Sequence, residues 1–147
     1  MKNIKKQLSF GLVCTVVLLG STFLSSCEKS DNINAMDTEV VGTWKLDAIT
    51  YGLTQVKVQG AKLPYTETRT FSANGDYTIS RDSKEVQTGK MYTGQGPSNL
   101  VDKQVIYYKE DTTYQAYELT EGRLLLYERA DQGAWIADGS TYEYKRQ

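Results

Sequence analysis

The side chains of this chain that could do chemistry are tyrosines, arginines and carboxylates, because the sequence contains no histidine. That absence excludes a Ser–His–Asp or Cys–His nucleophile, imidazole acid–base catalysis and a His-ligated metal. The two cysteines, Cys14 and Cys27, lie close to the N-terminus, so the rest of the chain has no disulfide framework. We therefore predict no catalytic residue, no metal site and no cofactor, and a protein that is not an enzyme.

The carboxylates do not form a recognisable catalytic set. A glycosidase needs two carboxylates at a set separation, with pKa values pushed apart. Glu110, Asp111, Glu118, Glu121 and Glu128 lie in one part of the sequence, but no spacing singles out a pair. Because exposed carboxylates are the rule in proteins, we expect these side chains to be solvated.

Tyrosine is the residue type that stands out, with 11 Tyr against 3 Phe. A ring with a polar tip could line a pocket for an amphipathic ligand, although Tyr is also a good strand former that places its hydroxyl at the surface. We select Arg69, Tyr77 and Tyr117 as candidate pocket residues. Arg69 shares a strand face with Phe71 and could bind a carboxylate ligand inside a barrel. Glu67 on the same face could instead pair with Arg69, or the whole face could be solvated.

Strands must position these residues, because polar and apolar residues alternate with a period of 2 over much of 39–147. The first strand, 39–51, places Trp44 and Leu46 on one face and polar residues on the other. Asn74-Gly75 between two alternating runs is a strong hairpin signal. Further strands are expected at 65–72, 76–81, 86–92, 104–109, 114–120, 123–129 and 141–145.

Eight strands joined by short turns predict an all-β fold. We expect a small antiparallel up-and-down eight-stranded β-barrel, since closure removes the exposed sheet edges. A two-sheet β-sandwich is the alternative, because periodicity does not report closure. The interior of such a barrel is either filled by side chains or just able to hold one small ligand. Residues 52–64 fit a loop over the barrel mouth and a short extra strand equally well.

Residues 1–26 have the features of an export signal. Lys2, Lys5 and Lys6 give a positive start, and 10–24 is an apolar run too short for a comfortable transmembrane span. The run ends in Leu24-Ser25-Ser26-Cys27, which resembles the lipobox of bacterial lipoproteins. The resemblance implies that the chain is cleaved before Cys27 and that this Cys is acylated. Several acyl chains would hold the protein firmly in a lipid bilayer.

The chain is thus expected to comprise a lipoprotein signal peptide at 1–26, a lipidated Cys with a flexible polar tether at 27–38, and a barrel domain at 39–147. Glu28 follows the Cys in place of the Asp that retains lipoproteins at the inner membrane. The resemblance therefore favours the outer membrane, on its periplasmic face or at the cell surface. The formal net charge is −1, and removal of the three leading lysines makes the remainder more acidic, so we exclude nucleic acid as a partner.

Two short motifs in the barrel region resemble lipocalin-like lipoproteins. The segment 40–46 contains Gly42-Thr43-Trp44, similar to the Gly-X-Trp start of that family's first strand, and 71–77 is similar to the strand–Asn-Gly–strand hairpin of its small bacterial members. The resemblance implies that Gly42 permits a tight start and that Trp44 plugs the closed end of the barrel. It also implies that a basic side chain packs on the Trp, for which Arg146 and Arg129 are the candidates.

These features together predict a membrane-anchored lipocalin-like lipoprotein. The expected function is to bind a small apolar or amphipathic ligand in the barrel or at its mouth. The alternative is an interaction or inhibitor module that contacts an envelope or host protein through the loops 94–103 and 130–140, since loops commonly carry such contacts.

Overall fold

The computed structural model describes residues 36–100, 102–134 and 136–147. The predicted signal peptide, Cys27 and most of the tether lie outside the described residues. Within the described part, no helix has the length and apolar character needed to cross a membrane. The regular structure there is β-strand, apart from the short 3₁₀ helices η1 (Gly60–Lys62) and η2 (Ser98–Leu100).

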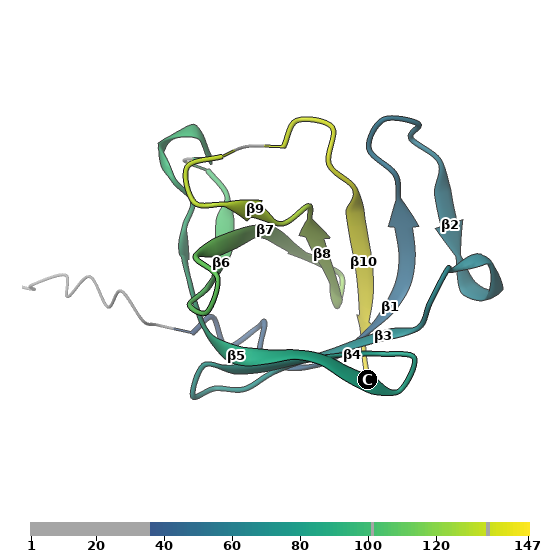
Figure 1. Ribbon diagram of the computed structural model, residues 1–147, viewed down its shortest axis with the longest axis horizontal. Coiled ribbons are helices and arrows are strands. Elements are labelled where there is room, and N and C mark those ends of the chain that lie inside the picture. Colours follow the sequence, from purple (N-terminus) through teal and green to yellow (C-terminus); the bar gives the residue numbers. More distant parts are fainter. Residues whose placement is uncertain (1–35, 101, 135) are drawn as a thin grey trace, which may run out of the picture. The chain divides into compact units, whose positions relative to one another are not determined.

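Eight antiparallel strands form a closed up-and-down barrel, which confirms the predicted fold (Figure 1). Consecutive barrel strands pair with one another, and the last strand pairs with the first through Trp44–Arg146 to Thr50–Thr141. This closing pair rules out the alternative of two separate sheets. The barrel strands are β1 (Gly42–Thr50), β3 (Glu67–Phe71), β4 (Asp76–Arg81), β5 (Lys84–Gln95), β6 (Gln104–Tyr108), β7 (Thr113–Thr120), β8 (Arg123–Tyr127) and β10 (Thr141–Arg146).

Two very short strands lie outside the ring. The strand β2 (Lys57–Gln59) pairs with the end of β1 and is followed directly by η1, so the segment 52–64 contains the short extra strand that the sequence left open. The strand β9 (Ala130–Asp131) pairs with the start of β7 and was not expected from the sequence. The strand β2 pairs with the part of β1 that β3 does not reach, and β9 pairs with the part of β7 that β8 does not reach.

Trp44 plugs one end of the barrel. Its side chain is fully buried, and its indole Nε1 donates a hydrogen bond to the carbonyl oxygen of Val40 at 2.7 Å. The guanidinium of Arg146 lies 4.3 Å from the centre of the indole ring, so Arg146 is the basic residue that packs on this Trp. Arg129, the other candidate, lies 3.6 Å from the ring centre of Tyr108. Val40, which accepts the indole hydrogen bond, is itself fully buried, so the residues just before β1 pack against the Trp.

Gly42 is required by its position at this closed end. Its φ is +143°, a conformation that residues with a side chain rarely adopt. A Cβ at this position would lie 2.5 Å from Nη1 of Arg146. A Gly two residues before the Trp is therefore explained by local packing, because it leaves room for the Arg146 guanidinium that covers Trp44.

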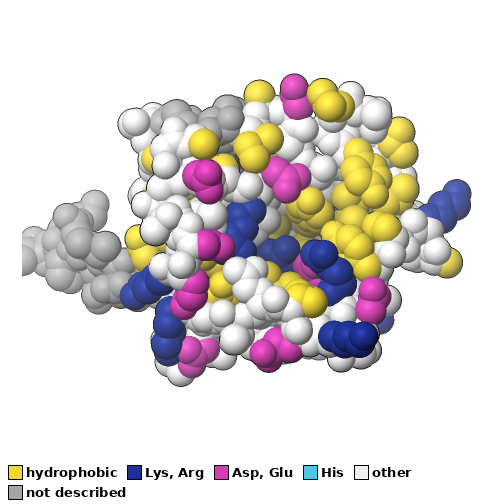
Figure 2. Space-filling model, viewed as in Figure 1, with side chains coloured by type: hydrophobic (Ala, Val, Ile, Leu, Met, Phe, Trp, Pro, Cys, Tyr) yellow, Lys and Arg dark blue, Asp and Glu magenta, His cyan; other side chains and the backbone are white. Residues whose placement is uncertain are grey.

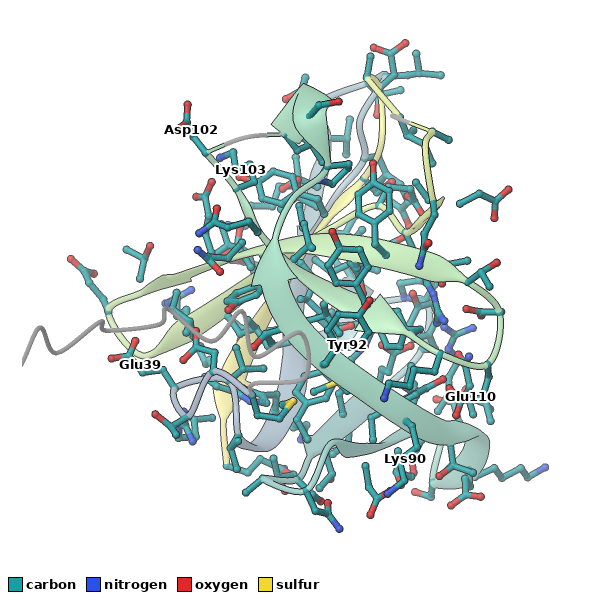
Figure 3. All side chains as sticks on the ribbon, turned by 90° about the vertical axis from the view of Figure 1, so that its left-hand side faces the viewer. Glu39, Lys90, Tyr92, Asp102, Lys103 and Glu110 are labelled. Atoms are coloured by element: carbon teal, nitrogen blue, oxygen red, sulfur yellow. The ribbon has the colours of Figure 1, made fainter. Side chains whose placement is uncertain are left out.

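A second, smaller core lies on the outside of the barrel wall. Tyr92, Tyr107 and Tyr114 are successive cross-strand neighbours on β5, β6 and β7, and the first two rings stack 4.8 Å apart. Tyr114 is buried here against Leu100 and Ala130, which belong to the segments that cross this wall. Figure 3 shows this side of the molecule, with Tyr92 between the labelled Lys103 and Lys90. The two loops proposed to contact partners thus also cover part of the barrel wall.

Candidate functional site

The middle of the barrel is filled by a buried ion-pair network centred on Glu67. The period of 2 on β3 directs Glu67, Arg69 and Phe71 inward, and all three are buried. Arg69 Nε donates to Glu67 Oε1 at 2.8 Å, and the hydroxyl of Tyr144 donates to the same oxygen at 2.5 Å. Arg81, at the end of β4, donates to Glu67 Oε2 through Nη2 at 2.7 Å and through Nε at 3.1 Å. One carboxylate therefore binds two guanidinium groups.

A second branch of the network fixes the other side of Arg69. Its Nη1 donates to Gln115 Oε1 at 2.9 Å, and the hydroxyl of Tyr108 donates to the same oxygen at 3.0 Å. Gln115 in turn donates through Nε2 to the backbone carbonyl of Tyr127 at 2.6 Å. A buried polar network is stable only when its members are satisfied, and these contacts meet that requirement. The network also occupies the interior in which an eight-stranded barrel could otherwise hold one small ligand.

The electrostatics of the network keep its ionic groups charged and its tyrosines neutral. Burial acts to raise the pKa of Glu67, but Arg69, the hydrogen bond from Tyr144 and Arg81 together hold the pKa below its ordinary value of 4.5. Burial raises the pKa of the Tyr144 hydroxyl well above its ordinary value of 10.0. Burial likewise raises the pKa of Tyr108, against the opposing effect of Arg69. Tyr144 therefore remains a hydrogen-bond donor to a charged Glu67 at neutral pH.

A cavity of about 310 Å³ opens above this network, at the end of the barrel opposite Trp44. Its walls carry the guanidinium groups of Arg69, Arg81 and Arg129, and its remaining lining includes Tyr65 and Tyr142. Figure 2 looks onto this face and shows Lys and Arg side chains gathered in a central hollow bordered by hydrophobic side chains. The volume is at the lower limit of small-molecule pockets.

Hydrogen bonds orient the arginines that line the cavity. Arg129, in the connection after β8, donates to Asp111 Oδ2 at 2.6 Å, to Thr113 Oγ1 at 2.5 Å and to Gln87 Oε1 at 3.0 Å. The guanidinium of Arg81 also lies 4.1 Å from the ring centre of Tyr65. A guanidinium carries five N–H donors in a rigid plane, so an arginine held by neighbours on one edge can still present donors to a ligand.

The structure brings one of the three predicted pocket residues to this cavity. Arg69 lies at its base. Tyr77 points into the interior but packs edge-on against Tyr108 below the cavity, with 1% of its surface exposed. Tyr117 is buried near the closed end, where its hydroxyl donates to Asp37 Oδ2 at 2.7 Å. The sequence allowed Arg69 to bind a ligand carboxylate, to pair with Glu67 or to be solvated. In the structure Arg69 is buried and pairs with Glu67.

Sequence reasoning missed most of the cavity's lining. Arg81 follows Tyr77 and Ile79 on the inward face of β4, so the period of 2 contained a signal for it. Arg129 and Glu128 lie in a connection between strands, where periodicity does not predict direction. Tyr142 shares a strand face with the buried Tyr144, but its place at this cavity depends on barrel closure, in which β10 pairs with both β1 and β8.

Another hollow, of about 620 Å³, lies beside β1 and shares Tyr65 with the cavity at the mouth. It occurs where β1 changes partner from β3 to β2, so that the ladder stops at Lys45 and resumes at Ala48. The ion pair between Lys145 and Asp47, at 2.8 Å, belongs to its lining. The lining of this hollow does not include Glu67, Arg69 or Tyr144. In the part of the chain that the structure describes, no group of three metal-ligand side chains lies together.

Comparisons with known proteins add no family assignment. No protein-family model matches the chain, and no curated protein and no solved structure matches it significantly.

Proposed function

We propose that this protein is a membrane-anchored, lipocalin-like lipoprotein that binds a small amphipathic molecule at the mouth of its barrel. The observation that carries the proposal is the cavity of about 310 Å³ lined by Arg69, Arg81 and Arg129, at the end opposite the Trp44 plug. Placed polar groups that fix a ligand's orientation are a feature of ligand sites, and here charged and amide side chains converge beside the rings of Tyr65 and Tyr142. The membrane anchor rests on the resemblance of residues 24–27 to a lipobox.

The buried network limits how the ligand would bind. Glu67, Arg69 and Tyr144 fill the middle of the barrel, so an extended apolar chain would have to displace an ion pair. Such displacement would leave buried charges without partners, at a cost of several kcal/mol. We therefore place the ligand in the mouth, where it would contact the outer edges of the arginines and the rings of Tyr65 and Tyr142.

Native mass spectrometry of the protein purified from its own cell envelope tests this function. The wild type should carry a co-purifying small molecule, whereas Val86→Trp should lose it. Val86 lines the cavity and is 55% exposed, so a Trp there fills the mouth and leaves the buried network intact. Leu53→Trp is the matched control, because Leu53 is 82% exposed and lies on another hairpin.

Two results would overturn the proposal. The first is a wild-type protein without any bound small molecule, together with a ligand screen that finds no binding. The second is equal retention of a ligand by Val86→Trp and Leu53→Trp, which would place the site elsewhere.

A further inference from the structure

The cavity at the barrel mouth carries one excess charge of each sign, on opposite walls. Arg81 ends β4, and Glu128 directly follows β8. In the ring of barrel strands, β4 and β8 are separated by β3, β1 and β10 in one direction and by β5, β6 and β7 in the other. The two strands are therefore diametrically opposed, and their charged residues face the same cavity from opposite sides.

The positive wall arises because two guanidiniums share one carboxylate. Glu67 accepts from Arg69 through Oε1 and from Arg81 through Oε2, which leaves this group of three with one uncompensated positive charge. The side chain of Glu67 is 1% exposed and that of Arg81 is 45% exposed, so the excess charge is accessible at Arg81. The third arginine, Arg129, is neutralised by Asp111 at 2.6 Å.

The negative wall arises because no cation pairs with Glu128. Its carboxylate accepts from the backbone N–H of Ser140 at 3.1 Å and from the hydroxyl of Tyr142 at 3.2 Å. These neutral donors orient the carboxylate without removing its charge. Among the described residues, no Lys or Arg forms an ion pair with Glu128.

The lining between the two charges mixes polar side chains, among them Gln87 and Gln115, with aromatic and aliphatic ones. Tyr65 and Tyr142 contribute aromatic rings, and Ile79 and Val86 contribute aliphatic side chains. A neutral apolar ligand would remove water from both charged walls without replacing its hydrogen bonds, which is costly. A dianion such as a phosphate monoester would face Glu128, and a simple amine would face Arg81. The best electrostatic complement is a molecule with one charge of each sign.

We propose that the ligand is a small zwitterionic amphiphile of the amino-acid class, with its carboxylate on Arg81, its ammonium on Glu128 and its apolar side group against Tyr65 and Tyr142. This inference rests on the proposed function and specifies its ligand. A cavity of about 310 Å³ accommodates a molecule the size of an aromatic amino acid or a short peptide. The guanidinium plane of Arg81 suits a carboxylate, because the two groups can form paired hydrogen bonds.

Calorimetric titration with three probes that share one apolar body tests the proposal. The probes are phenylalanine, 3-phenylpropionate, which lacks the amine, and phenethylamine, which lacks the acid. Hydrogen bonds to charged groups contribute enough for each missing group to cost about tenfold in affinity. Phenylalanine should therefore bind wild-type protein about tenfold more tightly than either of its analogues.

Two variants test whether Arg81 binds the carboxylate of the ligand and whether Glu128 binds its ammonium group. Arg81→Gln should weaken phenylalanine and 3-phenylpropionate about tenfold and leave phenethylamine unchanged or tighter. Glu128→Gln should weaken phenylalanine and phenethylamine and spare 3-phenylpropionate. Lys84→Gln is the control, because Lys84 is the exposed cross-strand neighbour of Arg81 and does not line the cavity.

The outcomes separate the inference from the function on which it rests. If the three probes bind equally well, or if Arg81→Gln and Glu128→Gln behave like Lys84→Gln, the zwitterion assignment is wrong and the ligand-binding function stands. If none of the three binds while the purified protein retains another small molecule, the assignment again fails alone. If no probe binds and no molecule co-purifies, both proposals fall.

Discussion

Glu67 is the single residue that links the barrel core to the cavity, because it is the only carboxylate bonded to both Arg69 and Arg81 among the described residues. Removing one partner of a buried ion pair leaves the other charged and desolvated. The same residue sets the accessible positive charge at the mouth. Stability and binding are thus coupled at this position, and its replacement cannot serve as a clean test of ligand binding.

The first residue-scale prediction concerns the buried carboxylate. Glu67→Gln should lower the free energy of unfolding by about 3–5 kcal/mol, because Arg69 would remain buried without its counter-charge. Glu118→Gln, which removes a half-exposed partner of Lys103, should cost less than about 1 kcal/mol. Urea unfolding of both variants measures the difference. Equal losses would mean that the Glu67 pair is solvated.

The second prediction compares two buried tyrosines. Tyr144 donates to Glu67 at 2.5 Å, whereas the buried hydroxyl of Tyr77 makes no hydrogen bond to any described residue. Tyr144→Phe should destabilise the protein by about 1.5–3 kcal/mol, because it removes a hydrogen bond to a charged group. Tyr77→Phe should be neutral or stabilising, because it removes an unsatisfied polar atom. Thermal unfolding of the two variants would contradict this if their order were reversed.

At the scale of elements, the start of β1 and the end of β10 act as one unit. Gly42, Trp44 and Arg146 meet there, and the arginine also donates to the carbonyl oxygens of Val41 and Glu39. This unit closes the sheet and covers the Trp at the same time. Its role is structural, since it lies at the end opposite the cavity.

Substitutions in this unit should therefore affect folding and not ligand choice. Trp44→Ala should cost about 3–5 kcal/mol, because a large buried side chain is lost. Arg146→Ala should cost about 0.5–2 kcal/mol for the lost cation–π contact, and about 0.5–1.5 kcal/mol more for each lost hydrogen bond to Val41 and Glu39. Chemical denaturation measures both values, and Arg146→Ala protein that still folds should bind ligand as the wild type does. If Trp44→Ala unfolds at the same denaturant concentration as the wild type, burial of Trp44 does not stabilise the barrel.

The elements were largely predictable from sequence, because each strand carries its own alternation. The hairpin at Asn74-Gly75 and the strand 76–81 follow directly from local chemistry, since Gly75 adopts a φ of +82°. The site was predictable only in part. Tyr144 and Glu67 are 77 positions apart, so their contact depends on barrel closure and on the register between β1 and its neighbours. Local periodicity identified Arg69 as inward but could not identify its partners.

At the scale of the whole barrel, the buried network should make stability depend on pH. Although burial opposes ionisation, Arg69 and the other donors lower the folded-state pKa of Glu67 below 4.5. A lowered carboxyl pKa contributes stability above the unfolded-state value and loses it as pH falls toward the folded-state value. The melting temperature should therefore fall as the pH drops below about 4.5. The fall should be shallower in Glu67→Gln, and identical pH profiles would contradict the assignment.

The central claim is that the ligand binds at the arginine-lined mouth and that the Trp44 end stays closed. The most direct measurement is a two-dimensional NMR titration of the ¹⁵N-labelled protein with phenylalanine, which resolves both ends at once. We expect shifts of the Arg81 and Arg129 side-chain Nε–H signals and of the Tyr142 backbone amide, with the Trp44 indole N–H unchanged. Shifts centred on Trp44 or on the outer wall around Tyr92, with none at the arginines, would contradict this claim.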